Sequence, residues 1–411
     1  IYHEFKRLLI YHMKKHLLLL SMFITSLYGC SSKNCEVQTS SGIETIPITD
    51  FETIYGKLSD FAEEVKMIPL EFTDKSILGE IKKVVMSDKF IFIMERTNQE
   101  GVYVFDHTGK FLYKIGTHGQ GPEEFVALFD FSINEKDGLI YLFDQPRTKI
   151  LVFTFDNKFI KDIPMNYYAS RFEYQYGLFY LYREHASDGS PLYSLVIKDQ
   201  NGNLVEKYYP MSQNADIMYT HDCIFRKREN DILFAQDLND SVFILSGNKL
   251  NPLYYIDYKN RTMSKEDRMD IKFHVRPPIN IILEKKTLGG ITDIFEIHDK
   301  VFIKNVNIIV PMLTIYDKKK KEIKTFQHLE DDILFLATGH PIGQYKDYLL
   351  SLQEQQQIQN SMDYFDIWIK DGYLNLTQNK ADKLRKMIEE KLSNRNTDEC
   401  NPVLFMIKVK K

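Results

Sequence analysis

Eight histidines between residues 107 and 340 are the side chains with the clearest potential for metal chemistry. None of them forms an H-x-H or H-E-x-x-H pair, so a metal site would have to be assembled from segments far apart in the chain. The dipeptide His221-Asp222, at the start of an expected strand, is the best single candidate. Histidine serves more often as a hydrogen-bonded core or surface residue than as a ligand. We therefore assign no metal and no cofactor.

Other clusters that invite a catalytic interpretation favour a structural one. Adjacent carboxylates such as Glu123-Glu124 point to opposite sides of a strand, so they make a poor acid and nucleophile pair for glycoside hydrolysis. The run Gly119–Phe125 lacks the Lys-Ser/Thr of a phosphate-binding loop and is expected to form a tight crossing. Lys318–Lys321 is expected to form a charged hairpin turn. No catalytic residue is assigned.

The composition is that of a folded, mildly acidic protein with a preference for sheet. The chain has 411 residues, of which 44% are hydrophobic, 13% aromatic and 27% charged, with a formal net charge of −4. Tyr and Phe favour pleated, half-buried surfaces. An acidic balance without a basic stripe argues against a nucleic-acid partner. Cys35, Cys223 and Cys400 are too scattered for a disulfide framework.

Residues 13–29 have the order of a secretory signal that starts at Met13, and the residues before Met13 are expected to lie upstream of it. Lys14 and Lys15 follow Met13, the apolar run Leu17–Tyr28 comes next, and Gly29 precedes Cys30. A basic segment, an apolar segment and a small residue before the cleavage point are the parts of a signal peptide. The apolar run is shorter than the ~20 residues of a membrane-spanning helix, so removal by cleavage is the expected outcome.

The segment Leu27-Tyr28-Gly29-Cys30 resembles the lipobox of bacterial lipoproteins, although Tyr28 replaces the small residue usual there. The resemblance implies that Cys30 carries a lipid and becomes the new N-terminus. The lipid would anchor the protein to a membrane. The expected location is therefore the cell envelope, and the expected membrane is the outer membrane. Residues 30–60 are polar and are expected to form a flexible tether.

A repeat occupies the rest of the chain. The strand-like segment Asp88–Ile93 returns 49 residues later as Asp137–Leu142, each followed by a second strand and an Asp, Asn or Gly turn. Such units cannot bury both faces alone and must close on one another. At ~50 residues per repeat, residues 61–411 predict an all-β, six-bladed β-propeller of four-stranded antiparallel blades, with seven blades as the alternative. Strands Val65–Leu70 and Val403–Val409 are expected to share one blade and close the ring.

A helical insertion is expected at about residues 378–395, in the last blade. Leu384, Met387, Ile388 and Leu392 recur at the spacing of one helix face. Capping the adjacent sheet edge is the simpler role for this helix, and binding a partner is the alternative.

Residues 109–159 resemble the NHL-type propeller repeat. The glycine-rich run Ile115–Phe125 is similar to its crossing between blades, and Ile140–Asp144 and Arg147–Phe153 are similar to two of its strands. With the lipobox, the chain resembles the six-bladed β-propeller lipoproteins of gut Bacteroidetes. That resemblance implies the fold and brings no catalytic residues with it.

Two functional hypotheses remain open. The first is a membrane-tethered binding or scaffold module whose ligand is a glycan, a peptide or a partner protein. Propeller ligands bind at the channel mouth, for which Arg171, Tyr174, His221 and Asp222 are the candidate residues. The second is a metal-dependent lyase or hydrolase in the same channel. It requires at least three His or acidic residues from different blades to converge.

Overall fold

The computed structural model describes most of the chain after residue 38. The described residues are 39–40, 42–49, 51, 53, 55–96, 100–183, 193–211, 224–236, 238–273, 275–288, 290–307, 310–372, 376–392 and 400–411. Every element described below lies within the compact unit Glu36–Lys411.

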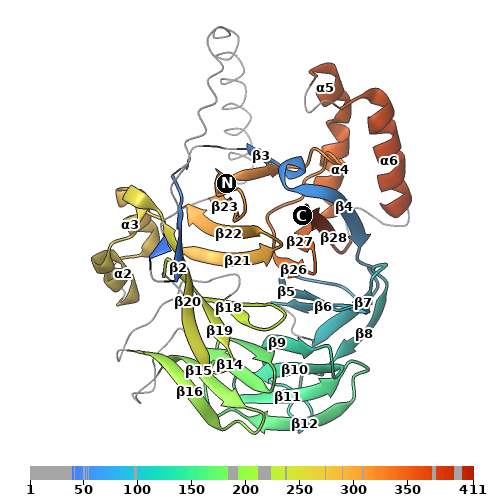
Figure 1. Ribbon diagram of the computed structural model, residues 1–411. Coiled ribbons are helices and arrows are strands. Elements are labelled where there is room, and N and C mark those ends of the chain that lie inside the picture. The colour runs from blue at the N-terminus through green and yellow to red at the C-terminus, as the bar shows by residue number, and fades with distance from the viewer. Residues whose placement is uncertain are drawn as a thin grey trace. The chain divides into compact units, whose positions relative to one another are not determined.

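Six blades of four antiparallel strands each form a β-propeller, and two further strands, β1 (Thr39–Ser40) and β2 (Ile43–Pro47), extend the sheet of the fourth blade (Figure 1). The first three blades are β5–β8 (Ile81–Met86, Phe90–Glu95, Val102–Asp106, Phe111–Ile115), β9–β12 (Leu128–Asn134, Leu139–Asp144, Lys149–Thr154, Phe159–Pro164) and β13–β16 (Arg171–Gln175, Leu178–Tyr182, Tyr193–Asp199, Leu204–Pro210). The next two are β17–β20 (Phe225–Lys227, Ile232–Ala235, Ser241–Ser246, Lys249–Asp257) and β21–β24 (Ile291–Ile297, Lys300–Asn307, Val310–Asp317, Glu322–Phe326). The predicted fold class is confirmed.

The sixth blade combines both ends of the folded unit. Its strands are β26 (Gly343–Tyr345), β27 (Tyr348–Gln353), β28 (Val403–Val409) and β4 (Ala62–Pro69). β4 pairs antiparallel with β28, and Met67 lies opposite Phe405 in the register. The expected closure of the ring by two distant strands is therefore confirmed.

Glycine-containing turns explain part of the repeat. Gly109 and Gly202 lie in equivalent turns between the third and fourth strands of blades 1 and 3, with φ of 87° and 79°. A Cβ at either position would lie 2.1 Å from the carbonyl oxygen of Pro69 or Pro164, at the end of the preceding blade's outer strand. Glycine is required at these turns because the backbone needs positive φ and the neighbouring blade approaches closely.

Apolar side chains fill the spaces between consecutive blades. Phe92, Phe131 and Leu142 belong to one buried cluster of blades 1 and 2, and Phe125 lies in the same cluster. Phe125 ends the glycine-rich crossing, where Arg147 Nη1 donates to the carbonyl oxygen of Glu124 at 2.8 Å. The run Gly119–Phe125 thus serves as a structural crossing, as expected.

The described residues between 39 and 60, here called the N-terminal strap, add strands to the four of each blade. β2 (Ile43–Pro47) runs parallel to β20, and β1 (Thr39–Ser40) pairs with β2. β3 (Tyr55–Lys57) pairs in parallel with β25 (His328–Glu330), and the 3-10 turn Leu58–Asp60 follows it. The tether was expected to reach residue 60, but the described fold begins before residue 61 because these strands find partners far along the chain.

The helices lie in two insertions. α4 (Gln355–Asp363), α5 (Phe365–Lys370) and α6 (Gln378–Leu392) separate β27 from β28. α6 covers most of the helical insertion expected at about residues 378–395, and two more helices precede it. Ile358, Ala381 and Ile388 bury their side chains in the adjoining core. α2 (Lys265–Lys272) and α3 (Pro278–Lys285), which the sequence analysis missed, separate β20 from β21. Among the described helices, none has the length and apolar character needed to cross a membrane.

Replacing Gly56 by Ala tests the contact between the strap and blade 5. The added Cβ would lie 2.5 Å from the ring of Phe326, which is buried. We expect Gly56→Ala to lower the free energy of unfolding by about 1–3 kcal/mol because the site is overpacked. Chemical denaturation of Gly56→Ala beside Lys57→Ala, an exposed neighbour in the same strand, is the measurement. Equal stability of the two variants would contradict the packing described.

Candidate binding cavity in the central channel

The first strands of the blades lie around the central channel and belong to separate sheets. Side chains therefore provide polar ties between them. Lys83 Nζ on β5 donates to Asp130 Oδ1 on β9 at 2.9 Å, and Asp130 Oδ2 accepts from the N–H of Phe172 on β13 at 2.9 Å. Farther round, Arg226 Nε on β17 donates to Asp293 Oδ1 on β21 at 2.8 Å. Buried charges are thus paired, as stability requires.

Glu173 is the centre of one such group. This carboxylate on β13 is 7% exposed, accepts from Ser132 Oγ on β9 and lies 3.1 Å from Lys227 Nζ on β17. Burial opposes ionisation, but Lys227, Lys83, Ser132 and the N–H of Tyr174 outweigh it and lower the pKa of Glu173. An ionised carboxylate therefore ties three inner strands together.

A cavity of about 1040 Å³ opens at the end of the channel where the inner strands finish. Its walls come from β5, β9, β13, β17 and β26 and from the turns that follow several of them. Ligand pockets usually measure ~300–1,000 Å³, so this cavity can hold several sugar or amino-acid units. The lining mixes both charges with amides, including Asn134, Lys136, Asp137, Gln200, Glu229 and Lys346.

Two tyrosines stand on the rim of this cavity. Tyr176 is 71% exposed, adopts φ of 47° and donates from its hydroxyl to the carbonyl oxygen of Glu229 at 2.6 Å. Tyr345 donates to Asp88 Oδ1 at 2.8 Å. They belong to blades 3 and 6, which are opposite in a six-membered ring. Tyr176 is thus a bulky residue at positive φ whose strain is not offset by burial. Such residues are uncommon, and this one points to a use beyond folding.

The channel narrows near the starts of the inner strands. A space of about 40 Å³ is lined there by Lys82, Arg171, Phe172 and Ile224, among others. Burial, followed by the positive charge of Arg171, lowers the pKa of Lys82 to about 8.

The structure separates two of the residues proposed from the sequence. Arg171 lines the narrow space, whereas the ring of Tyr174 is 4% exposed and lies 4.2 Å from that of Tyr141, centre to centre, in the core between blades 2 and 3. Although Tyr174 is adjacent to the cavity, its side chain packs between blades. His221, Asp222 and Cys30 lie outside the described residues.

Two residues of the channel, Glu173 and Tyr176, were not among the candidates proposed from the sequence. They flank Tyr174 and Gln175. The position of Tyr176 in the sequence could have indicated its role. It occupies the turn after an inner strand, where Asn or Gly is preferred.

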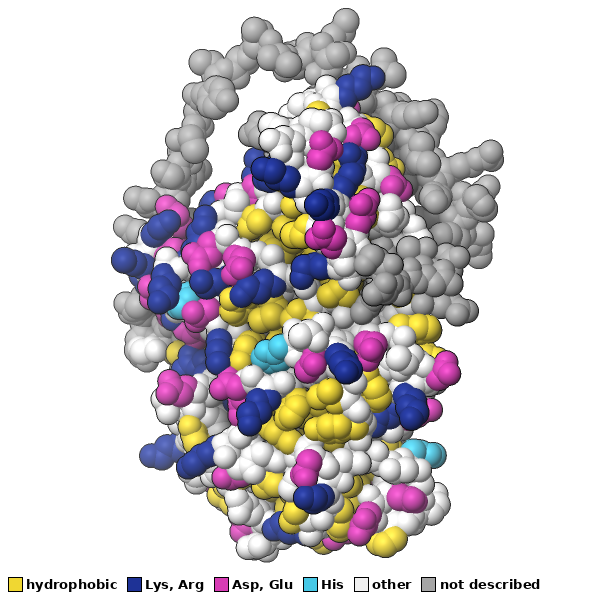
Figure 2. Space-filling view, turned by 90° about the vertical axis from the view of Figure 1, so that its right-hand side faces the viewer, with side chains coloured by type: hydrophobic (Ala, Val, Ile, Leu, Met, Phe, Trp, Pro, Cys, Tyr) yellow, Lys and Arg dark blue, Asp and Glu magenta, His cyan; other side chains and the backbone are white. Residues whose placement is uncertain are grey.

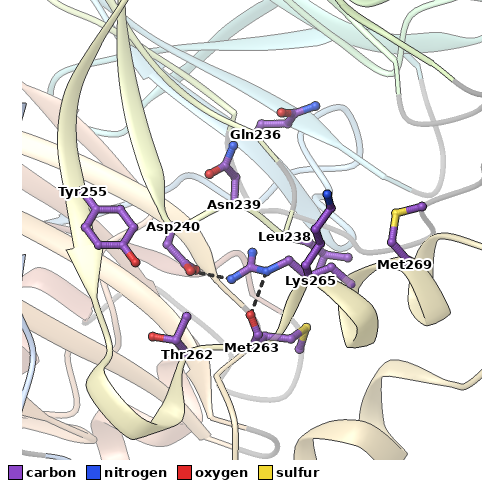
Figure 3. Close-up of a pocket in the computed structure, with 10 residues that line it drawn as sticks. Gln236, Leu238, Asn239, Asp240, Tyr255, Thr262, Met263, Lys265 and Met269 are labelled. Carbon is purple, nitrogen blue, oxygen red and sulfur yellow. Dashed lines mark hydrogen bonds and ion pairs between the residues drawn. The ribbon is translucent and has the colours of Figure 1, made fainter.

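A second pocket of about 440 Å³ lies beside α2 (Figure 3). Asp240 is 6% exposed and forms an ion pair with Arg268, which also donates to the carbonyl oxygen of Met263 at 3.1 Å. Burial raises the pKa of Asp240, although Arg268 opposes the shift. This pocket is built from one blade and one insertion, so it lacks the convergence of several blades seen in the channel.

Within the described ranges, no three His, Cys, Asp or Glu side chains come together in a way that could hold a metal ion. On the face shown in Figure 2, the coloured side chains of Lys and Arg are interspersed with those of Asp and Glu. That face therefore carries a mixed charge.

The fold and the channel define a six-bladed β-propeller with a wide cavity of mixed polar and apolar lining at one end of its ring. Residues 44–408 match the family described as Domain of unknown function (DUF4934), and the chain belongs to that family. No curated protein matches the chain.

Two solved structures share the fold. An inferred exported protein from Bacteroides fragilis is similar with a TM-score of 0.68 and 16% identity, covering 89% of this chain and 100% of its own. A member of the DUF4221 family from Bacteroides vulgatus is similar with a TM-score of 0.51 and 11% identity, covering 85% of this chain and 98% of its own. These likenesses support the architecture alone.

Replacing Glu173 by Gln tests the charged tie between inner strands. Because folding lowers the pKa of Glu173 from its ordinary 4.5, its contribution to stability is present above pH 4.5 and is lost as pH falls through the folded value. We expect Glu173→Gln to lower the free energy of unfolding at pH 7 by about 1–3 kcal/mol, since Lys227 loses its partner. The deficit should shrink below pH 4.

Chemical denaturation from pH 3 to pH 7 measures this difference. Glu206→Gln is the matched control, because Glu206 lies on the outer strand of the same blade. A pH-independent effect of Glu173→Gln would contradict the ionised tie.

Proposed function

We propose that the protein is a lipid-tethered binding module of the cell envelope that holds a glycan chain in its channel cavity. The observation that carries the proposal is the 1040 Å³ cavity, whose walls come from five blades. Ligand sites in folds of this kind form where polar groups from several elements converge on one concavity.

The chemistry of the rim supports a neutral, hydroxyl-rich ligand. Lys136 and Lys346 are accompanied by Asp137 and Glu229, so neither sign of charge dominates. Sugar hydroxyls both donate and accept hydrogen bonds, which suits mixed amides, acids and amines. The exposed ring of Tyr176 offers an apolar face to a sugar ring at little cost in conformational entropy.

Export and tethering rest on other features. The Leu27–Cys30 segment resembles a lipobox, and the similar Bacteroides fragilis protein is named as exported. Lipid attachment at Cys30 would keep the module at the surface of a membrane. The outer membrane is the one we expect.

The Tyr176→Asn variant tests the proposal. Asn tolerates positive φ better than Tyr, so stability should stay the same or rise by up to about 1 kcal/mol. Binding should weaken at least about tenfold, the equivalent of ~1.4 kcal/mol, because the rim loses its aromatic face. Residues 31–411, which contain every described element, would be screened on a glycan array and titrated calorimetrically against the bound glycan.

Tyr364→Asn is the control, since Tyr364 is also an exposed tyrosine, at 52%, and lies between α4 and α5, outside the cavity lining. It should bind as wild type. No glycan binding, or full affinity in Tyr176→Asn, would overturn the proposal, and a peptide ligand would replace the glycan if only peptides bind.

A further inference from the structure

The α2–α3 insertion presents an apolar outer surface. Five large apolar side chains between residues 269 and 283 are exposed, with Val275 at 66% and Leu283 at 53%. The five are Met269, Phe273, Val275, Ile279 and Leu283. Single exposed apolar residues are common on protein surfaces, but a group this dense marks an interaction surface. We call these five residues the α2–α3 face.

This face is held on an ordered support. Ile271, Ile281 and Ile282 point the other way and form a buried cluster with Leu238 and Met263. Ser264 caps α2 by accepting from the N–H of Asp267 at 3.1 Å, and Lys285 of α3 forms an ion pair with Asp267 at 2.5 Å. Both helices are thus amphipathic, with one side in the core and the other side in water.

The charge around the face is opposite to that of the whole protein. Between residues 259 and 286 the sequence has eight Lys and Arg but four Asp and Glu, whereas the complete chain has a net charge of −4. Amphipathic helices with apolar residues on one side and basic residues beside them lie in the interface of anionic membranes. The combination of exposed apolar side chains with an excess of basic residues therefore fits an anionic lipid surface.

The start of the described chain lies beside the same insertion. β2 lies beside β20, with which it pairs in parallel (Figure 1). The N–H of Ile48 donates to the carbonyl oxygen of Asp257 at 2.9 Å, and Arg261 lies 4.5 Å over the ring of Phe51. Thr39 lies nine positions after Cys30, and nine residue steps span at most about 30 Å. A lipid on Cys30 would keep the insertion close to the membrane.

We propose that the α2–α3 face docks onto an anionic lipid surface. The proposal rests on the proposed function in one respect, since the lipid tether would orient the face towards the membrane. The apolar and basic side chains of the face would bind lipid without the tether. The face would then fix which side of the propeller is turned towards the membrane.

The test uses unacylated residues 31–411 and two kinds of vesicle. Vesicles of phosphatidylcholine alone are compared with vesicles that contain roughly one-third phosphatidylglycerol, and bound protein is measured by co-sedimentation. Wild type should bind the anionic vesicles. The double variant Val275→Ser/Leu283→Ser should bind about tenfold less, because it loses apolar surface that enters the membrane.

A matched control separates this effect from a general loss of apolar surface. Ile160→Ser/Leu204→Ser removes two side chains that are 52% and 55% exposed on β12 and β16, and it should bind as wild type. Wild type that ignores anionic vesicles, or equal binding by both double variants, would overturn the proposal. A self-association in sedimentation velocity that only Val275→Ser/Leu283→Ser abolishes would also overturn it, in favour of a second copy.

Failure of the proposed function would show differently. Metabolic labelling of the full chain with a radioactive fatty acid, beside Cys30→Ser, reports the tether alone. Glycan titration of Val275→Ser/Leu283→Ser reports the cavity alone and should give wild-type affinity.

Discussion

Antiparallel pairing between β4 and β28 is the interaction on which the rest of the fold depends. Each blade must bury both faces against neighbours, so an open ring would expose apolar surface on the first and last blades. Leu404 and Ile68 of the closing blade share one core cluster with Ile91 and Phe105 of blade 1. The N-terminal strap strengthens the closure, since it contacts blades 4 and 5 before β4 enters blade 6.

Closure also creates the cavity. Inner strands of different blades belong to separate sheets, and side chains such as Asp130, Glu173 and Arg226 supply ties between them. These buried groups are paired and hydrogen-bonded, which makes them supports of the channel wall. The groups left to meet a ligand are those on the turns beyond the strands, among them Tyr176, which is 71% exposed. Along each inner strand, the residues within the strand therefore support the channel wall, and the residues in the turn after it are left to contact a ligand.

The fold could be predicted from the sequence because its signals are local and repeated. Strand alternation and Asp, Asn or Gly turns predicted the blades, and the apolar segments Val65–Leu70 and Val403–Val409 predicted the closing pair. The strap was missed because β2 and β3 are short strands in a polar stretch, whose partners lie far along the chain. α2 and α3 were missed because eight residues give little more than two turns of periodicity.

The site was harder to predict than the fold. Tyr174 and Tyr176 are two residues apart, yet Tyr174 packs between blades while Tyr176 stands in a turn. Which of them meets a ligand depends on where the strand ends, and sequence patterns locate element ends least reliably. Ties such as Lys83 to Asp130 join residues 47 positions apart, and their pairing depends on how neighbouring blades align.

The most direct test of the closed ring is a disulfide lock between β4 and β28. Glu64 and Lys408 face each other in the register, so both would be replaced by Cys in a chain whose other cysteines are Ser. Hydrogen–deuterium exchange would then be compared between the oxidised and reduced forms. If closure controls the whole ring, the lock slows exchange in β13–β16 of blade 3, on the far side, as well as in blade 6. Slowing confined to blade 6 would show that the blades open independently and would contradict this account.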